Sequence, residues 1–567
     1  MNSRGDSERH CRKCKVGSPT PRVSPDTITS MRKYLRLEGA ISDYQTKDVV
    51  RTLDDIQSDI ADYSTEISRL EARILTLNVK RNFLEHYAEP VGLSILAPIR
   101  KLPSEILSEI FAQCGSYGNS IARKKSFDMS RQPAWAVSST CSRWRRIALS
   151  CKPLWSNIRL DLHGTHVASS KAEYFAVLAL NRCLHLSHPH PLTLRTKSSL
   201  SDVTQTGMSL VRSLILHADR WQDLTIVNNE SQVEVLPPDI RSSIQLPALQ
   251  TLSIETPHTM LGLQAFERAP KLRHFTLDGR LPNPPVPFPW SQLTSINFQY
   301  FHGPVFAALG ACSNLKSLTI NADHSERDSP SRNSTSLPVK LPSLRYLEIA
   351  AAGNATTVDY DSLTLIFTSL TLPSLAELMV YNYDNDRFLG KWPQRDFETF
   401  VRRSQCEITS LHLDEMPLSD TQALSLLRAL PTICTLTIED SRLMLKNDKQ
   451  VTITSTLVEA LGVFNGIRNP FETRGVEVLL PNLESLVLRS RSTPSTDLLD
   501  DKILVDMIKS RWVPDTTFAS IAKVKCLKSC SITYVSGERK IDSSAEKTLD
   551  CLVDDGLQFS WEREKCS

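Results

Sequence analysis

The sequence predicts an α/β solenoid that is preceded by a small α-helical unit and, before that unit, by a coiled-coil helix. Three observations predict this organisation. A short apolar pattern recurs through residues 249–488, apolar residues spaced alternately by three and four run through residues 53–84, and two amphipathic segments rich in tryptophan lie within residues 95–158.

The first 44 residues are polar, rich in Ser, Pro, Arg and Lys, and lack a sustained period. We therefore predict a disordered tail over residues 1–44. His10, Cys11 and Cys14 are of the residue types that bind zinc. A structural zinc ion needs four ligands, and the next cysteine is Cys114, so we expect no metal here.

Residues 45–90 are expected to form a coiled coil. From Leu53 to Leu84 the apolar residues follow the period of a coiled-coil seam, and charged residues flank them. Two interpretations remain open. The seam pairs with a second chain, which makes the protein a possible homodimer, or a single amphipathic helix folds back on its own protein.

Residues 93–162 are predicted to form the helical unit. One helix starts near Ser104 and ends at Gly115, and a second ends before Pro153. So few residues cannot bury all of the apolar surface internally, and the unit therefore needs a partner. The apolar face comprises Leu102, Ile106, Leu107, Ile110 and Phe111 in the first helix and Val137, Cys141, Trp144 and Ala148 in the second.

The motifs of this unit are LPSEILSEIF from Leu102, VSSTCSRWRRIA from Val137 and KPLWSNI from Lys152, and they resemble those of an F-box. The order of coiled coil, F-box and irregular repeats is similar to that of the large group of F-box proteins of mushroom-forming fungi. A long loop, residues 116–133, departs from the family pattern. The resemblance implies eight residues that contact a Skp-family adaptor or hold the three-helix fold together: Leu102, Pro103, Ile106, Leu107, Ile110, Val137, Cys141 and Trp144.

Residues 163–535 are predicted to form the solenoid. Each repeat is too small to bury its own apolar face, so stacked repeats share one continuous core. The alternative is an ordinary α/β domain whose buried strands look alike, and nine copies in register disfavour it. The central apolar residues of the copies are Leu252, Phe275, Ile296, Leu318, Leu347, Leu378, Leu411, Leu436 and Leu486.

The repeats resemble leucine-rich repeats in an irregular form, because the Asn or Cys that usually follows the last strand leucine is missing from almost every copy. The turns after the strands must therefore satisfy their backbone groups in another way. Residues 536–567 carry a capped helix and then a strand from Leu557, and we expect them to cap the C-terminal end of the solenoid.

Side chains alternate along a strand, so the residues just after the strand leucines are expected to face the open inner surface. Four of these residues are acidic: Glu255, Asp278, Asp414 and Glu439. Our hypothesis is that this face binds a basic segment of a partner protein. Solvated surface charge is the alternative interpretation.

The composition limits the kinds of partner and the cellular compartment that we expect. The 66 basic residues nearly balance the 63 acidic ones, so we expect no nucleic-acid partner. There is no early apolar run typical of a signal peptide and no stretch long enough to span a membrane. We expect an intracellular protein, cytoplasmic or nuclear, that makes no membrane contact and whose cysteines are free thiols.

The common signatures of phosphate binding, catalytic zinc and an activated serine are absent from the sequence. We expect no cofactor, no metal and no enzymatic activity. The cluster of His185, His188 and His190 has no Cys or carboxylate ligand nearby in sequence, and we interpret it as a surface loop.

These observations predict the substrate-recognition subunit of a Skp-cullin-F-box ubiquitin ligase. The resemblance implies that the F-box docks the Skp adaptor, and through it a cullin, while the repeats bind an unidentified target protein. The alternative is a non-catalytic repeat scaffold that dimerises through its coiled coil and uses the F-box-like unit as a cap. An enzyme whose site is assembled from distant residues is the third interpretation.

Overall fold

The computed structural model divides into two compact units, Met1–Ile106 (unit 1) and Leu107–Ser567 (unit 2). The structure describes residues 19–36, 38–122, 129–161, 170–197, 205–228, 233–234, 244–283, 286–299, 303–321, 338–351, 362–382, 392–440, 451–463, 478–490, 499–535 and 543–564. The histidine and cysteines considered above as zinc ligands, His10, Cys11 and Cys14, lie outside these ranges.

Unit 1 is built on the long helix α2 (Asp43–Phe83). Ser42 begins the helix with a capping box, in which its hydroxyl accepts from the Gln45 backbone and the Gln45 side chain accepts from the Ser42 backbone. The other helical segments of the unit are α1 (Pro25–Tyr34), the π-helical turn η1 (Leu84–Ala88), α3 (Glu89–Leu96) and the 3-10 turn η2 (Pro98–Lys101).

Part of the segment for which we predict disorder is helical. Ser24 caps helix α1, and the residues before it are held by Asp59 of α2. The Asp59 carboxylate accepts from the Arg22 backbone N–H at 2.8 Å, from the Arg22 guanidinium at 3.0 Å and from the Val23 backbone N–H at 3.1 Å. The order of this segment thus depends on a side chain 37 residues away in the sequence, which no local pattern reveals.

The helix expected over the seam is present, and its seam is not covered. The seam side chains Leu53, Ile60, Tyr63, Ile67, Leu70, Ile74, Leu77 and Leu84 are each 39% to 59% exposed. The face that a coiled coil would bury is therefore accessible from Ile60 onward, whereas Ile56 is half-buried and Thr52 and Asp59 beside the seam are buried. Pairing with a second chain stays a prediction at this point.

Unit 2 contains one large parallel sheet. Fifteen strands follow one path in the order β1-β2-β3-β4-β6-β7-β8-β9-β11-β13-β14-β15-β16-β17-β18, and β5 pairs with β6 beside this path. These strands are β1 (Asn119–Ala122), β2 (Asn157–Asp161), β3 (Leu192–Lys197), β4 (Trp221–Val227), β5 (Val233–Glu234), β6 (Thr251–Leu261), β7 (His274–Arg280), β8 (Ser295–Phe298), β9 (Ser317–Asn321), β11 (Tyr346–Ala351), β13 (Glu377–Asn382), β14 (Ser410–Asp414), β15 (Thr435–Glu439), β16 (Ser485–Ser490), β17 (Ser529–Val535) and β18 (Gln558–Glu564).

The α/β solenoid-like fold that the sequence predicts is confirmed by the register of this sheet. The nine predicted central residues, from Leu252 to Leu486, pair with one another strand by strand. Each is at most 2% exposed. We call this row the apolar ladder. Fully burying a side chain of this size contributes roughly 1.5–3 kcal/mol, so the ladder is the main core of unit 2.

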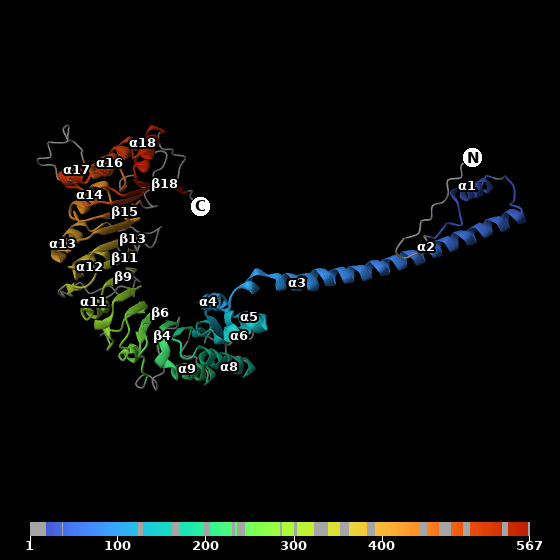
Figure 1. Ribbon diagram of the computed structural model, residues 1–567, viewed down its shortest axis with the longest axis horizontal. Coiled ribbons are helices and arrows are strands. Elements are labelled where there is room, and N and C mark those ends of the chain that lie inside the picture. Colours follow the sequence, from blue (N-terminus) through green and yellow to red (C-terminus); the bar gives the residue numbers. More distant parts are fainter. Residues whose placement is uncertain are drawn as a thin grey trace. The chain divides into compact units, whose positions relative to one another are not determined.

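Helices lie against the apolar face of the sheet. Figure 1 shows α11, α12, α13 and α14 along one side of the stacked strands of unit 2. The helices of unit 2 and the helix that leads into it are α4 (Ser104–Gly115), α5 (Pro133–Thr140), α6 (Ser142–Ser150), α7 (Lys152–Ser156), α8 (Ser170–Ser187), α9 (Gln205–Ile215), α11 (Gly303–Gly310), α12 (Ser362–Ser369), α13 (Gln394–Ser404), α14 (Asp420–Arg428), α15 (Ser455–Leu461), α16 (Asp501–Arg511), α17 (Thr516–Ala522) and α18 (Ser543–Asp554). Short elements complete the unit: η3 (Met129–Arg131), η4 (Ala218–Arg220), η5 (Leu263–Phe266), η6 (Trp290–Gln292) and the two-stranded pair β10 (Val339–Lys340) and β12 (Leu370–Thr371).

The sheet extends beyond the nine predicted strands in both directions. At its N-terminal end Ile158, Leu194 and Leu224 continue the row of Leu252 through β2, β3 and β4. At its C-terminal end Cys530 and Phe559 continue it through β17 and β18. The helical unit predicted over 93–162 thus contributes β1 and β2 to the same sheet as the repeats.

Arginine side chains satisfy backbone carbonyl groups near the ends of helices in unit 2. Arg511, at the end of α16, donates to the carbonyl oxygens of Leu461, Leu479 and Leu480, and it is fully buried. Burial lowers its pKa to about 10. A guanidinium at a helix C-terminus satisfies carbonyls that have no partner within the helix and interacts favourably with the helix dipole.

Two other arginines of unit 2 donate to carbonyl oxygens near helix ends in the same way. Arg403, in the last turn of α13, donates to the carbonyl oxygens of Phe367 and Leu370 at the end of α12. Arg220 donates to the Leu184 carbonyl at 3.2 Å near the end of α8 and to the His190 carbonyl at 2.7 Å. The histidine cluster predicted as a surface loop therefore borders a buried structural arginine.

Two further properties concern the described residues as a whole. Among their helices, none combines the length and the apolar character that crossing a membrane requires. The cysteines within the described ranges are free thiols, as expected: Cys114, Cys141, Cys151, Cys183, Cys312, Cys406, Cys434, Cys526, Cys530 and Cys551.

Truncating the apolar ladder should destabilise unit 2. Leu411→Ala removes a side chain that is 1% exposed, and the cavity it leaves should lower the free energy of unfolding by about 2–5 kcal/mol. Its neighbour Ser410 lies half-buried on the other face of β14. Ser410→Ala should therefore stay within about 0.5 kcal/mol in the same urea titration followed by circular dichroism. Equal losses for the two variants would contradict the assigned register.

The forked shape of Arg511 should matter as much as its charge. In Arg511→Lys a single ammonium group replaces a planar fork, and leaving a buried carbonyl unsatisfied costs about 1–3 kcal/mol. We expect a loss of about 2 kcal/mol or more in the free energy of unfolding. Arg428 occupies the same last-turn place in α14 but is exposed, so Arg428→Lys is the matched control and should leave stability unchanged.

Candidate partner-binding surfaces

The helical unit of unit 2 packs around two aromatic pairs. Phe111 of α4 is 1% exposed, and its ring centroid lies 5.0 Å from that of Trp144 in α6. A second pair joins α5 to α7, where the Trp135 and Trp155 rings meet edge to face at 5.2 Å. The Trp155 indole N–H donates to the Ala148 carbonyl at 2.7 Å, so the buried ring is also satisfied.

Close backbone contacts fasten this unit to the first strands of the sheet. The Asn119 side chain in β1 is fully buried, donates to the Leu154 carbonyl at 2.8 Å and accepts from the Ala134 N–H at 3.1 Å. At Gly115 a Cβ atom would lie 2.8 Å from the Leu154 Cα atom. Only glycine permits this approach of α4 to α7.

The second predicted helix is interrupted. Cys141 has an extended backbone with φ −159° and ψ 170°, which separates α5 from α6. Its sulfur accepts from the Trp144 N–H at 3.5 Å and so caps α6. Val137 and Trp144 therefore do not share one face of a single helix, which corrects the prediction. A cysteine cap was not recognisable from the sequence because Ser, Thr, Asp and Asn are the usual caps.

The eight residues predicted for adaptor binding differ widely in accessibility. Leu107 is completely buried, so it supports the fold and cannot contact a partner directly. Ile110, one turn later in α4, is 37% exposed. Val137, Cys141 and Trp144 are half-buried. In unit 1, Leu102 is half-buried, Pro103 is exposed and Ile106 is 50% exposed.

The sheet face opposite the apolar ladder is lined by polar side chains in regular rows. At its centre the Tyr346 hydroxyl donates to the Glu348 carboxylate at 2.8 Å, and burial and this carboxylate raise the pKa of Tyr346. His412 lies two strands further along the sheet, in β14. Burial lowers its pKa, and the neighbouring Glu439 carboxylate counteracts this shift only in part. Hydroxyl, carboxylate and imidazole groups from neighbouring strands thus lie side by side on this face.

The four acidic residues predicted on this face form two pairs in register. Glu255 lies beside Asp278 in β6 and β7, and Asp414 lies beside Glu439 in β14 and β15. Glu255 is ion-paired with Arg195 at 3.0 Å. Glu439 is only 8% exposed and is also ion-paired. Glu255 and Glu439, two of the four predicted binding residues, are thus partly neutralised, and Glu439 is covered as well.

The partner of Glu439 was not recognisable from the sequence. Arg489 lies 3.2 Å from Glu439, although the two residues are 50 positions apart. Carboxylate oxygens of Asp414, Glu415 and Glu439 lie within 4.8 Å of one another, which is the spacing of a possible cation site. Because Arg489 already supplies positive charge to this group, we assign no metal to it.

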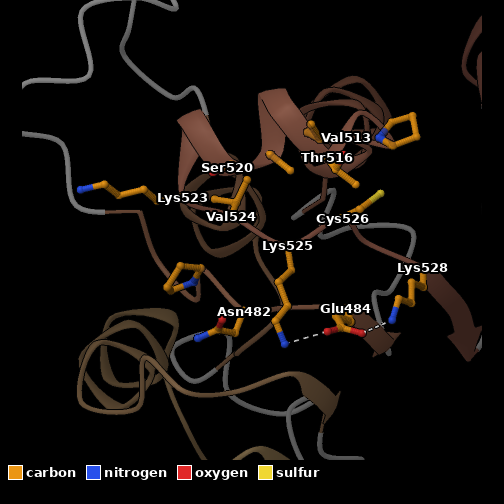
Figure 2. Close-up of a pocket in the computed structure, with 13 residues that line it drawn as sticks. Asn482, Glu484, Val513, Thr516, Ser520, Lys523, Val524, Lys525, Cys526 and Lys528 are labelled. Atoms are coloured by element: carbon orange, nitrogen blue, oxygen red, sulfur yellow. Dashed lines mark hydrogen bonds and ion pairs between the residues drawn. The ribbon is translucent and has the colours of Figure 1, made fainter.

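A pocket of about 500 Å³ lies at the start of the last strands, beside α17. Figure 2 shows Lys525 and Lys528 on either side of Glu484, and both ammonium groups contact its carboxylate. These contacts lower the pKa of Glu484. The lysines are largely exposed, and such ion pairs contribute little to stability, so the pocket is an open, mixed-charge surface depression.

Comparison with known proteins adds no relative: the chain matches no model of a protein family and no curated protein. Function must therefore be argued from the residues and their geometry.

Neutralising Asp278 should stabilise the fold. Burial and then the adjacent Glu255 raise the pKa of Asp278, so its ionised form opposes folding. Asp278→Asn should raise the midpoint of thermal unfolding at pH 7, and the gain should shrink in high salt. It should also shrink as the pH falls below the raised pKa of Asp278, because the wild-type carboxyl is then neutral too. Asp550→Asn, an exposed carboxylate on α18, is the control; a destabilised Asp278→Asn would contradict the assigned repulsion.

Proposed function

We propose that this chain is the substrate-recognition subunit of a Skp-cullin-F-box ubiquitin ligase. In this proposal the unit of α4, α5 and α6 binds the Skp adaptor, and the polar face of the sheet binds a target protein. The chain carries out no chemistry itself. It raises the effective concentration of the target near the enzyme that transfers ubiquitin.

The observation that carries the proposal is the exposed Ile110. It projects from the same α4 helix whose Leu107 and Phe111 are buried, within the motif that resembles an F-box. An exposed branched apolar side chain on a unit otherwise well packed is what an apolar interface needs. Half-buried Val137 and Trp144 supply further apolar area in the same unit.

The regular polar face supports a role in binding a protein target. Its rows run along fifteen strands, so it offers a long surface on which many side chains contribute. Ion pairs such as Arg489 with Glu439 hold the charged groups in fixed positions. Recognition by this face would depend on the pattern of the polar groups more than on net charge.

Adaptor binding tests the proposal directly. The full-length chain should bind a purified Skp-family adaptor in isothermal titration calorimetry. Ile110→Glu should weaken binding about tenfold or more, because it places an unpaired charge in an apolar interface. Leu178→Glu is the matched control, since Leu178 on α8 is also exposed, at 45%, and should bind like the wild type.

The choice of Ile110 keeps folding and binding separate. Leu107→Ala would create a core cavity and is unsuitable for this purpose. A folded wild-type chain that does not bind the adaptor would refute the proposal. If Ile110→Glu bound the adaptor as tightly as the wild type, the adaptor contact would lie outside α4.

The exposed seam of α2 favours a second candidate, a repeat scaffold that dimerises through its coiled coil. In that case the unit of α4 to α7 serves as a cap on the first strands of the sheet, and no adaptor is bound. The two candidates differ in adaptor binding, and only the scaffold candidate requires a partner helix on α2.

A further inference from the structure

The seam of α2 repeats every seven residues, alternating steps of three and four from Leu53 to Leu77; Arg81 then interrupts the apolar row before Leu84, the first residue of η1. A seven-residue stripe slowly winds around a straight helix, so it stays in contact with a partner only where the two helices supercoil around each other. The seven exposed seam residues from Leu53 to Leu77, together with half-buried Ile56, form a continuous apolar stripe. A stripe of this kind marks an interaction surface.

Charges beside the seam indicate what covers it. The residues immediately before each first seam position of a heptad, which we call the g side, are Thr52, Asp59, Glu66, Arg73 and Lys80, and the last four of them are charged. The g side therefore reads acidic, acidic, basic, basic along α2. If a second copy of the helix runs in the opposite direction, its basic residues lie beside the acidic residues of the first copy. A copy of the same helix running in the opposite direction is complementary to it.

We propose that α2 pairs with α2 of a second copy of this chain as an antiparallel, two-stranded coiled coil. The register places Ile67 opposite the partner's Leu70. It then places Ile60 opposite the partner's Leu77 and Leu53 opposite the partner's Leu84. Ile56 faces the partner's Arg81, whose aliphatic stem can cover the seam while its exposed guanidinium stays at the edge of the pair. In this register Glu66 faces the partner's Arg73 and Asp59 faces the partner's Lys80.

A parallel pair of the same helices is less favourable. In a parallel coiled coil each g-side residue faces the residue that follows the second seam position of the partner's next heptad. Glu66 would then face the partner's Glu71, which places two carboxylates together on both sides of the pair. Lys80 would face the partner's Glu85, but Glu85 lies in η1 beyond α2 and is already ion-paired with Arg81 of its own chain at 3.6 Å, so this attraction offsets the repulsion only in part. The antiparallel register contains no such repulsion among the g-side residues.

The contact between Glu66 and the partner's Arg73 determines whether the two helices run parallel or antiparallel. Asp59 already accepts three hydrogen bonds from Arg22 and Val23, so its contact with the partner's Lys80 adds little. Glu66 contacts Arg69 of its own helix at 2.6 Å and is half-buried, while Arg73 is exposed. A carboxylate can accept from two cations, so Glu66 remains able to contact the partner's Arg73.

This inference does not depend on adaptor binding. It specifies the pairing that the scaffold candidate requires, and it is equally compatible with a dimeric ligase subunit. The chains leave an antiparallel pair at opposite ends.

Sedimentation equilibrium of the full-length chain tests the proposal, with the dimer dissociation constant as the readout. The wild type should sediment as a dimer, and Ile67→Asp should be monomeric at the same concentration. Arg73→Glu should weaken the dimer about tenfold, because two attractive pairs become repulsive. Glu66→Arg should weaken it similarly. The double variant Glu66→Arg with Arg73→Glu should recover the wild-type constant, since it restores both pairs with exchanged signs.

The single variant Glu66→Arg distinguishes the two directions. In a parallel pair it would replace a repulsion with an attraction to the partner's Glu71 and tighten the dimer. Arg51→Glu makes the same charge change on the outer side of α2 and should leave the constant unchanged. Differences among the charge variants should fade at about 1 M salt, where screening is nearly complete.

Each outcome decides the matter. A monomeric wild type at the highest workable concentration would overturn the pairing and the scaffold candidate together, while leaving adaptor binding unaffected. A dimer that tightens in Glu66→Arg would overturn the antiparallel direction alone. A dimer that persists in Ile67→Asp would place the interface outside α2.

Discussion

The register of the apolar ladder is the constraint on which the rest of unit 2 depends. Leu252, Phe275 and their counterparts up to Leu486 meet at the same level of the sheet, so each strand turns the same side toward the helices. A slip of one residue would turn every apolar side chain of a strand to the polar face. The same register aligns Glu255 with Asp278 and Asp414 with Glu439. Core and polar face are therefore positioned by one set of strand pairings.

Stacked repeats must also satisfy the backbone groups where helices end. Arg511 and Arg403 each reach carbonyl oxygens near the end of the preceding helix, and Arg220 reaches those near the end of α8, which lies one helix further back than α9. A fork with several donors can serve two or three carbonyls at once. This solution acts between neighbouring repeats and needs no repeated asparagine. It also explains how repeats of unequal length stack in one sheet, since each arginine serves a local junction.

The exposed surfaces differ in chemical character. The α2 seam and Ile110 of α4 are apolar, while the open face of the sheet is polar. On that face the ion pairs of Glu255 with Arg195 and of Glu439 with Arg489 neutralise two of the four acidic residues. A simple attraction for basic segments is thereby reduced. What remains is a patterned surface of hydroxyl, imidazole and carboxylate groups, which favours a shape-specific partner.

The sequence alone determined the strands of the repeats, their register, the long helix over residues 53–84 and the helix that ends at Gly115. These features depend on the local period of apolar residues and on nearby breakers, which a single sequence displays. Only the tertiary structure decided the break at Cys141, the entry of β1 and β2 into the sheet and the docking of Arg22 on Asp59. It also decided that Leu107 is buried while Ile110 is exposed, and that Arg489 holds Glu439. The reason is that each of these depends on contacts between residues far apart in the chain, and the spacing of residues along the sequence carries no record of them.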